Sequence, residues 1–328
     1  MERELFIQIR DKIKKEIPFI IDLAENVSEI DCYQSFADAA TAHGYIKPKV
    51  TDKTYINIKG GRHPLVEANL PPGDFIENDF YLESGKENLI MLTGPNMAGK
   101  STFLRQNAII VLMAQAGSFV PATEAEIGVV DKMFCRVGAS DNLARGESTF
   151  LVEMSETANI LRCATQNSFI IMDEVGRGTG TNDGLAIAWS ICEYLTEKCR
   201  AKTIFATHYH ELTQMDNPDV VNMSMNASEE RGKLVFLKKI VRGAASKSYG
   251  IHVAELAGIP YEIIVRAKEL MAAFEKETKA AVVPEQTGTM DLFPQEDLLR
   301  SEILSADVSN MTPVQALTFL SDLQERYK

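Results

Sequence analysis

The stretch Leu92–Thr102, "LTGPNMAGKST", decides how the rest of this 328-residue chain is interpreted. From Gly94 to Ser101 it fits the pattern G-x-x-x-x-G-K-S/T, and it continues the apolar run "NLIMLTG". After a strand and before a helix, this pattern predicts a loop whose backbone N–H groups bind phosphate oxygens at a helix N-terminus. Lys100 is then expected to reach the β and γ phosphates, and the Ser101 hydroxyl to bind Mg²⁺. The stretch therefore predicts a site for a nucleoside triphosphate.

Two later strand ends carry candidate catalytic groups. The apolar run "SFIIMDE" ends in Asp173, which is placed to hold magnesium through its water shell, and Glu174, which is placed to orient or deprotonate a water. His208 ends the run "TIFATH" and can hydrogen-bond the γ-phosphate or the lytic water. The alternatives are two solvated acids and a structural histidine. The order of phosphate loop, acidic pair and strand-end histidine favours the catalytic interpretation.

Short apolar runs alternate with helical patterns through most of the chain. Such an alternation predicts an α/β fold with a mostly parallel sheet. Two runs around "SEERG" predict an antiparallel hairpin. The main expected helices cover 101–117, 148–166, 182–199 and 259–277, and the expected strands lie within 54–67, 74–82, 88–94, 168–174, 202–208, 220–227 and 233–241.

The chain is expected to divide into three parts. Residues 1–50 have helical spacing interrupted at Pro18, which fits either a helix packed on the domain or the end of a longer helix. Residues 51–278 form the α/β domain. Residues 279–328 combine a Pro- and Gly-containing linker with a final helix, for which Thr312 is a suitable N-cap.

The composition is that of an ordinary soluble protein, with 45% hydrophobic and 24% charged residues. The formal net charge of −12 disfavours the chain as the main grip on nucleic acid. A local basic stripe is conceivable at Lys238, Lys239 and Arg242, although a solvated strand end is the simpler interpretation. The five cysteines show no C-x-x-C spacing, which predicts reduced thiols and a cytoplasmic location.

Five long motifs together point to one family. They are "TGPNMAGKSTFLRQ" (93–106), "GESTFLVEMSETANIL" (146–161), "IIMDEVGRGTGTNDGLAIAW" (170–189), "ATHYHEL" (206–212) and "GAASKSYGIHVAELAGIP" (243–260). This set resembles the ATPase domain of the MutS family of bacterial DNA mismatch repair proteins, over nearly the whole chain. The opening "ERELFIQIRDKI" resembles the returning helix of that family's lever domain. The resemblance implies a P-loop NTPase of the ABC-type class, a helical lever segment, a helix-turn-helix dimerisation region and a helical C-terminal region.

The resemblance also implies an ATPase with ATP and Mg²⁺ as cofactors and a composite site in a dimer. Ser148 and Thr149 of one subunit would face the partner's γ-phosphate, and "GRGTGTNDG" would cross the dimer interface. Phe75, in "DFIEN", matches the aromatic residue that stacks on adenine, although it also fits a core aromatic. Asn96 would contact the phosphates or the lytic water, and Ala98 stands where some members carry glycine. The implied nucleotide-binding residues are Gly94, Pro95, Asn96, Met97, Ala98, Gly99, Lys100, Ser101, Thr102 and Phe75; the catalytic ones are Glu174, His208 and Asn96; the metal ligands are Ser101 and Asp173.

The partners implied by the resemblance are a second copy of the chain, MutL and mismatched double-stranded DNA. The family's mismatch-reading, connector, core and clamp domains do not precede Met1, so we expect a fragment or truncated reading frame that alone does not recognise a mismatch. The C-terminal helix would allow a tetramer, and the cytoplasmic protein would associate with the nucleoid. Met290–Phe293, in "GTMDLF", resembles a peptide that docks on the replication sliding clamp, the alternative being an unimportant linker.

Two other functions remain open at the level of sequence. The first is another ABC-type ATPase, such as a transporter subunit, although "ESTFLVEM" stands where such proteins carry LSGGQ. The second is a non-catalytic dimerisation or docking module. Steady-state ATP turnover measured against protein concentration separates the enzyme from the non-catalytic module.

Overall fold

The computed structural model describes residues 1–95, 98–138, 148–230, 233–245 and 249–280. Asn96, Met97, the linker with Met290–Phe293 and the expected C-terminal helix therefore lie outside the described residues. The chain divides into two compact units, Met1–Ile259 and Pro260–Lys328. The described part of the second unit contains helix α7 (Tyr261–Ala280), which follows a proline as expected from the sequence.

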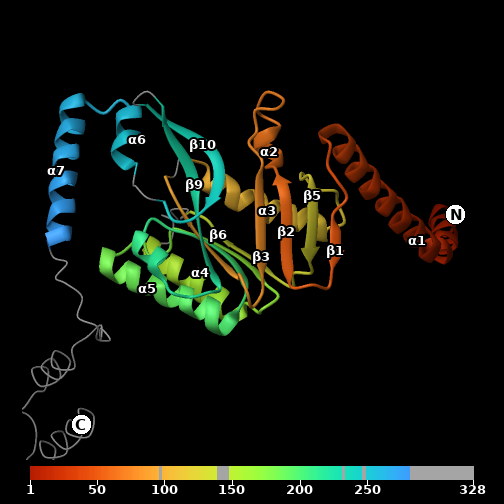
Figure 1. Cartoon of the computed structure of the whole chain (residues 1–328). Coiled ribbons are helices and arrows are strands. Elements are labelled where there is room, and N and C mark those ends of the chain that lie inside the picture. Colours follow the sequence, from red (N-terminus) through yellow and green to blue (C-terminus); the bar gives the residue numbers. More distant parts are fainter. Residues whose placement is uncertain (96–97, 139–147, 231–232, 246–248, 281–328) are drawn as a thin grey trace, which may run out of the picture. The chain divides into compact units, whose positions relative to one another are not determined.

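A six-stranded sheet forms the centre of the first unit (Figure 1), in the order β10-β9-β4-β8-β7-β6. The paired strands from β9 to β6 are parallel, and only β10 is antiparallel to its neighbour β9. This arrangement confirms the predicted α/β class with a mostly parallel sheet. The strands are β4 (Leu89–Thr93), β6 (Met133–Arg136), β7 (Phe169–Asp173), β8 (Lys202–Ala206), β9 (Val220–Glu230) and β10 (Lys233–Arg242).

A smaller mixed sheet of four strands has the order β1-β5-β2-β3. Strand β1 runs parallel to β5, whereas β2 runs antiparallel to both β5 and β3. The sequence patterns predicted β2 and β3 but neither β1 nor β5, and they did not indicate a separate sheet. The elements are β1 (Lys49–Thr51), β2 (Tyr55–Gly61), α2 (Pro64–Glu67), β3 (Asn78–Glu83) and β5 (Glu124–Gly128).

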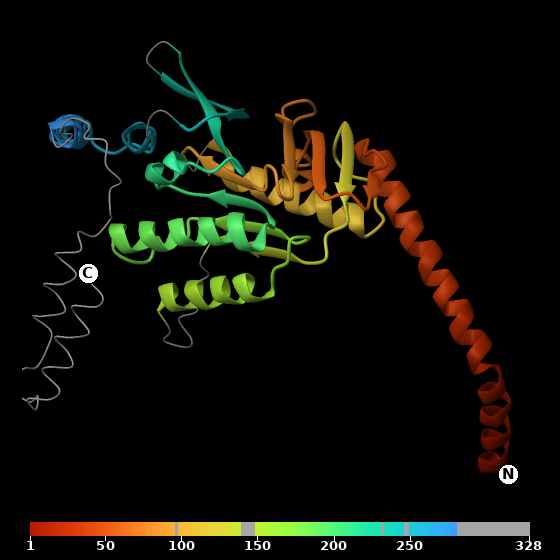
Figure 2. The ribbon, with the colours of Figure 1, turned by 60° about the horizontal axis from the view of Figure 1, so that its bottom comes forward.

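Helices cover both faces of the larger sheet, which explains why its strands are apolar runs rather than alternating ones. Along β4, Ile90 and Leu92 join the core shared with helix α3 and the smaller sheet, while Leu89 and Met91 face the core formed by α4 and α5. Figure 2 shows α4 and α5 next to each other on the face opposite α3. The helices are α3 (Lys100–Gln115), α4 (Thr149–Cys163), α5 (Thr181–Glu193) with its π-helical extension η3 (Tyr194–Cys199), the 3₁₀ helix η4 (His210–Gln214) and α6 (Gly250–Leu256).

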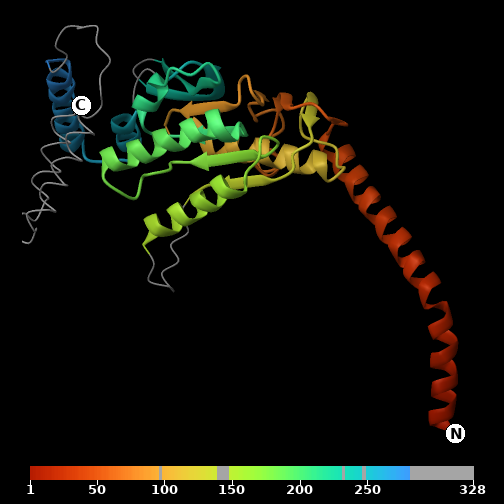
Figure 3. The same ribbon diagram turned by 90° about the horizontal axis from the view of Figure 1, so that it is seen from below.

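Helix α1 (Glu2–His43) is continuous, so the predicted interruption at Pro18 is wrong. An internal proline removes one hydrogen bond, and the cooperativity of a long helix carries it across that gap with a bend. Figure 3 shows such a bend in the N-terminal half of α1. The helix ends at Gly44, whose φ of 60° gives a left-handed C-cap. Within the described residues, no helix is both long and apolar enough to span a membrane.

Candidate nucleotide site

The phosphate loop connects the end of β4 at Thr93 with the start of α3 at Lys100. Gly99 is the residue before the helix and has a φ of 105°, a conformation that side chains other than glycine rarely adopt. The Ala98 N–H donates to the Pro95 carbonyl at 3.0 Å, which closes a tight turn. The first turn of α3 leaves backbone N–H groups without helical acceptors, and such groups at a helix N-terminus are suited to binding phosphate.

The three predicted motifs meet at one edge of the larger sheet. Strand β8 lies between β4 and β7, with Ala206 in register with both Leu92 and Asp173. Beyond the strands, the Glu174 N–H donates to the Ala206 carbonyl at 2.9 Å, and the Thr207 N–H donates to the Leu92 carbonyl at 3.0 Å. The parallel pairing therefore brings together the loops that carry Lys100, Glu174 and His208, as ligand sites of open α/β sheets require.

Lys100, Ser101 and Asp173 form the partly buried centre of this edge. The Ser101 hydroxyl donates to Asp173 Oδ2 at 3.5 Å. Lys100 is only 2% exposed, and burial lowers the pKa of its ammonium group, against the opposing effects of Glu174 and Asp173. Burial likewise raises the pKa of the Asp173 carboxyl, and Glu174 raises it further. Each charge is thus short of solvation, which a phosphate beside the lysine and a cation beside the carboxylate would supply.

The donor set fits Mg²⁺. Ser101 and Asp173 offer a hydroxyl and a carboxylate oxygen, the hard ligands that Mg²⁺ prefers. Across the described part of the chain, no group of three His, Cys, Asp or Glu residues could hold a metal ion without other ligands. A site with two protein oxygens suits a metal that takes its remaining ligands from water and substrate phosphates.

Glu174 has an unusual backbone conformation for a residue with a side chain. Its φ is 54°, in the left-handed region. Its carboxylate forms an ion pair with Arg177, three residues later. Arg177 was not predicted to act here, although the i,i+3 spacing of opposite charges was a usable signal.

His208 lies two residues after the end of β8 and is exposed to solvent. Partial desolvation lowers the pKa of its imidazole, while the nearby Glu174 carboxylate acts in the opposite direction. Arg177 and Lys100 also act on it, again toward a lower pKa. The neutral form is therefore favoured near neutral pH, so the ring can both donate and accept a hydrogen bond.

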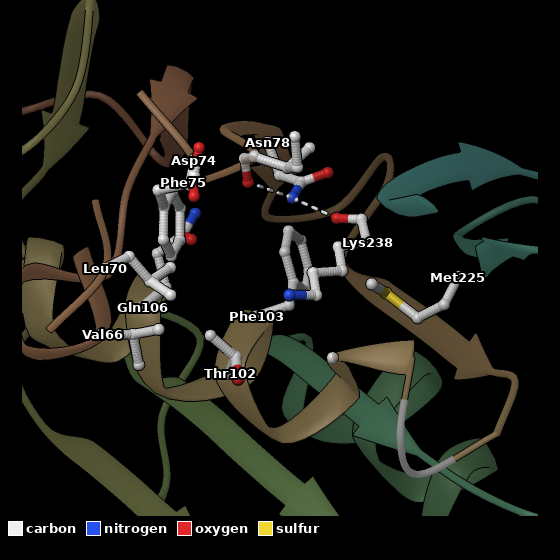
Figure 4. A pocket seen from close by; sticks show the side chains of 12 residues that line it. Val66, Leu70, Asp74, Phe75, Asn78, Thr102, Phe103, Gln106, Met225 and Lys238 are labelled. Atoms are coloured by element: carbon white, nitrogen blue, oxygen red, sulfur yellow. Dashed lines mark hydrogen bonds between the residues drawn. The ribbon is translucent and has the colours of Figure 1, made fainter. Parts of the chain in front are cut away.

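Phe75 lines a pocket that begins at the last glycine of the phosphate loop (Figure 4). Its ring is half-buried, so it forms a pocket wall rather than part of the closed core. Gly99 and Thr102, which were also predicted to bind the nucleotide, line the same pocket, whereas the walls formed by Met225 and Lys238 were not predicted because they come from distant segments. The remaining lining residues are Val66, Leu70, Asp74, Ile76, Asn78, Gly99, Thr102, Phe103, Gln106, Met225 and Lys238.

Asn78 holds two sides of this pocket together. Its amide donates to the Lys238 carbonyl at 3.0 Å and accepts from the Ile240 N–H at 2.7 Å. The contact spans β3 and β10, where the register with β9 shifts and Lys238 has a φ of 53°. Bulges of this kind re-aim side chains beside functional sites, and nothing in the local sequence indicates this one.

The candidate basic stripe at Lys238, Lys239 and Arg242, for which a solvated strand end was the favoured interpretation, has partners within the chain. Lys239 Nζ donates to the Glu77 carbonyl at 2.7 Å, and Arg242 forms an ion pair with Glu87 at 3.0 Å. Lys238 lines the pocket. The arrangement resembles the solvated, internally paired strand end more than a surface that collects phosphates.

Ser148 and Thr149 begin helix α4 and are exposed. Ser148 is the N-cap residue in an extended conformation and makes no side-chain capping hydrogen bond. The loop after Glu174 packs against the same turn, since a Cβ placed on Gly178 would lie 3.1 Å from the Phe150 Cβ. The helix N-terminus therefore combines a positive dipole end with two exposed hydroxyls.

Comparison with known proteins assigns this chain to a family. The model of the family described as MutS domain V matches residues 90–275. The chain is 49% identical, over 99% of its length, to the DNA mismatch repair protein MutS of Treponema denticola. It is 48% identical over its whole length to that of Thermodesulfovibrio yellowstonii, and 50% identical over 99% to that of Caldanaerobacter subterraneus subsp. tengcongensis. The chain spans 39%, 39% and 38% of the length of these relatives.

Proposed function

The chain belongs to the MutS family of DNA mismatch repair proteins, and from this premise we propose that it binds Mg-ATP and hydrolyses it in a composite site of a dimer. The observation that carries the proposal is the hydrogen bond from Ser101 to Asp173, beside the buried Lys100. It joins the phosphate loop to the strand end that carries Glu174. A solvated lysine or an unrelated pair of acids would not explain why the phosphate loop contacts this strand end.

Binding follows from the loop and the pocket. The backbone N–H groups at the start of α3 donate hydrogen bonds to the phosphate oxygens, and Lys100 supplies a fixed positive charge to the β and γ phosphates. The pocket beside Gly99 receives the base, and Phe75 stacks on it. Ser101 and Asp173 would hold Mg²⁺, which would supply positive charge beside the phosphoryl oxygens.

Hydrolysis assigns separate roles to Glu174, His208 and Asn96. The Glu174 carboxylate, which is paired with Arg177, accepts a proton from the attacking water or orients it. Neutral His208 hydrogen-bonds the γ-phosphate or the water, which makes it a reporter of whether the γ-phosphate is present. Asn96 acts beside them on the phosphates or the water.

The second half of each site comes from the partner subunit. Ser148 and Thr149, exposed at an uncapped helix N-terminus, contact the partner's γ-phosphate with their hydroxyls and backbone N–H groups. Turnover then requires two chains, so the state of the nucleotide determines how the dimer is held together.

The wider roles concern the longer proteins that the chain resembles. We place it in the cytoplasm at the nucleoid, as the part that couples nucleotide state to mismatched DNA and to MutL through domains beyond this chain. The proposed division is a lever end at 1–50, an ATPase and dimerisation region at 51–278, and a tail at 279–328. The tail would support a tetramer and dock on the sliding clamp through Met290–Phe293.

Steady-state ATP turnover measured against protein concentration tests the proposal. Turnover per chain should rise with concentration as dimers form. A Lys100→Ala chain and a Ser148→Ala chain should each be nearly inactive, and mixing them should restore partial activity because one site of each heterodimer is intact. ATP binding without turnover at any concentration would instead identify a non-catalytic dimerisation module. No recovery in heterodimers confirmed by mass would contradict the composite site.

A further inference from the structure

The peptide backbone two residues after Glu174 is held from both sides. The Gly176 N–H donates to Glu153 Oε1 at 2.6 Å, and the Tyr209 hydroxyl donates to the Gly176 carbonyl at 3.0 Å. Both hydrogen bonds are buried, where they are stronger and more costly to lose than at the surface. One residue therefore has its donor and its acceptor committed to side chains from two other elements.

Glu153, on α4, is only 6% exposed and is itself fixed by a buried arginine. Arg136 Nη2 lies 3.7 Å from Glu153 Oε2, while Arg136 Nε lies 2.9 Å from Glu156. A carboxylate this deep persists only when it is paired and hydrogen-bonded. The Gly176 N–H supplies a hydrogen bond to the Glu153 carboxylate, and Arg136 supplies the opposite charge.

Helix α5 closes the third side. A Cβ placed on Gly184 would overlap both the Gly176 carbonyl oxygen and the Tyr209 hydroxyl. The helix can approach this closely only because residue 184 has no side chain. We call Glu153, Gly184 and Tyr209, arranged around Gly176, the Gly176 clamp.

We propose that the Gly176 clamp positions Glu174 for hydrolysis and ties it to the helix that serves the partner's site. Only Val175, which is 1% exposed, separates Gly176 from Glu174. The left-handed φ of 54° at Glu174 persists only if the surrounding structure fixes it. The clamp provides that constraint, so Glu153 and Tyr209 are positioning residues.

The connection to the second site runs along α4. This helix starts at Ser148 and Thr149, which serve the partner's nucleotide in the proposed composite site, and it carries Glu153 one turn later. If contact with the partner's γ-phosphate displaces the start of α4, Glu153, which accepts from the Gly176 N–H, moves with the helix. Tyr209, next to His208, reports the state of the chain's own site to the same peptide. The inference rests on the proposed function and adds a route between the two sites of a dimer.

Two single-atom changes test the positioning role. Tyr209→Phe removes only the hydroxyl, and Glu153→Gln keeps an oxygen for Gly176 while losing the charge that faces Arg136. Each is expected to lower kcat about tenfold, or about 1.4 kcal/mol, with an unchanged KM and an ATP affinity close to that of the parent. Matched controls are Tyr81→Phe, whose hydroxyl donates to Glu83, and Glu156→Gln, whose carboxylate also pairs with Arg136 but does not touch Gly176. Clamp variants with the same kcat as the controls would overturn the proposal.

Heterodimers separate positioning within one site from the route between sites. In the reference dimer, one chain carries Lys100→Ala and the other is unaltered, so only the unaltered chain's own site turns over. Adding Tyr209→Phe to the Lys100→Ala chain changes nothing in the active chain. We expect turnover to fall further, by about fivefold (about 1 kcal/mol), because α4 of the altered chain serves the active site. Equal rates in the two heterodimers would overturn the route. Absence of turnover in the unaltered homodimer would instead overturn the proposed function itself.

Discussion

Replacement of Phe75 tests where the base binds, independently of where the phosphates bind. Phe75→Ala removes one aromatic wall of the pocket, which is lined by Gly99 but not by Lys100. The variant should therefore bind ATP more weakly but bind inorganic tripolyphosphate as the parent does. Lys100→Ala should weaken both ligands, because each depends on the same positive charge.

The expected loss follows from the exposure of the ring. Stacking of a base on an aromatic side chain contributes about 1–3 kcal/mol. The Phe75 ring is already half-buried before any ligand binds, so part of its apolar surface gains nothing from the base. The lower part of the range, about 1–2 kcal/mol, is therefore expected, which corresponds to about 5- to 30-fold weaker ATP binding.

Isothermal titration calorimetry with ATP and with tripolyphosphate, at one salt and Mg²⁺ concentration, measures both affinities. Phe75→Leu keeps apolar volume without a flat ring and should lose most of the same affinity. Phe119→Ala, which removes an aromatic side chain from a separate surface site, is the matched control and should change neither ligand. An equal loss of both ligands in Phe75→Ala, or no loss of ATP, would refute the base pocket.

Further expectations concern the catalytic edge, the packing of the clamp and DNA. Glu174→Gln should keep the ATP affinity and lose about 10²–10⁴-fold in turnover; a rate near the parent's in a rapid-quench assay would assign the water to another group. Folding raises the pKa of the Asp173 carboxyl above its ordinary value of 3.8. The ionised carboxylate therefore lowers the free energy of unfolding at pH values above the raised pKa, and this loss of stability disappears below pH 3.8. Asp173→Asn should thus raise the Tm at neutral pH but not in strong acid, and a lowered Tm at neutral pH would contradict the sign. Gly184→Ala should cost about 1–3 kcal/mol in urea unfolding through overpacking, and an unchanged midpoint would show that α5 can shift. Matched and G·T-mismatched duplexes should bind equally and weakly at about 0.15 M salt; a clear preference in a fluorescence titration would place mismatch sensing within this chain.

The part of the site that the sequence predicts is local. Gly94, Gly99 and Lys100 lie in one turn between a strand and a helix. Their spacing in the sequence therefore also predicts their arrangement in space. The apolar runs before Asp173 and His208 predict strands that end in candidate catalytic groups, and the structure brings both strand ends to the edge that holds Lys100. The carboxyl ends of parallel strands lie at the same edge of a sheet whatever the strand order. The proximity of Lys100, Asp173 and His208 could therefore be predicted from the sequence.

The remaining contacts depend on pairs that are distant in the chain. Gly176 is 23 residues from Glu153 and 33 from Tyr209, and the pocket joins Phe75 to Met225 and Lys238. No periodicity or motif spacing reports which buried carboxylate faces which backbone N–H. These contacts follow from strand order and from the register shift in β10, which are properties of the assembled sheet.

The orientation of Glu174 shows how much of the chemistry depends on such contacts. A side chain held at a φ of 54° costs about 1–3 kcal/mol, and a residue at the end of a strand would relax to an extended conformation if it could. The Glu174 N–H is committed to the Ala206 carbonyl, and Gly176 is fixed on both sides, so the peptide between them has no room to rotate. The strain is therefore balanced by buried hydrogen bonds from α4 and from the residue after His208. In the proposed mechanism, a carboxylate held in this way responds to movements of either element, so its position would depend on the nucleotide state of both sites of the dimer.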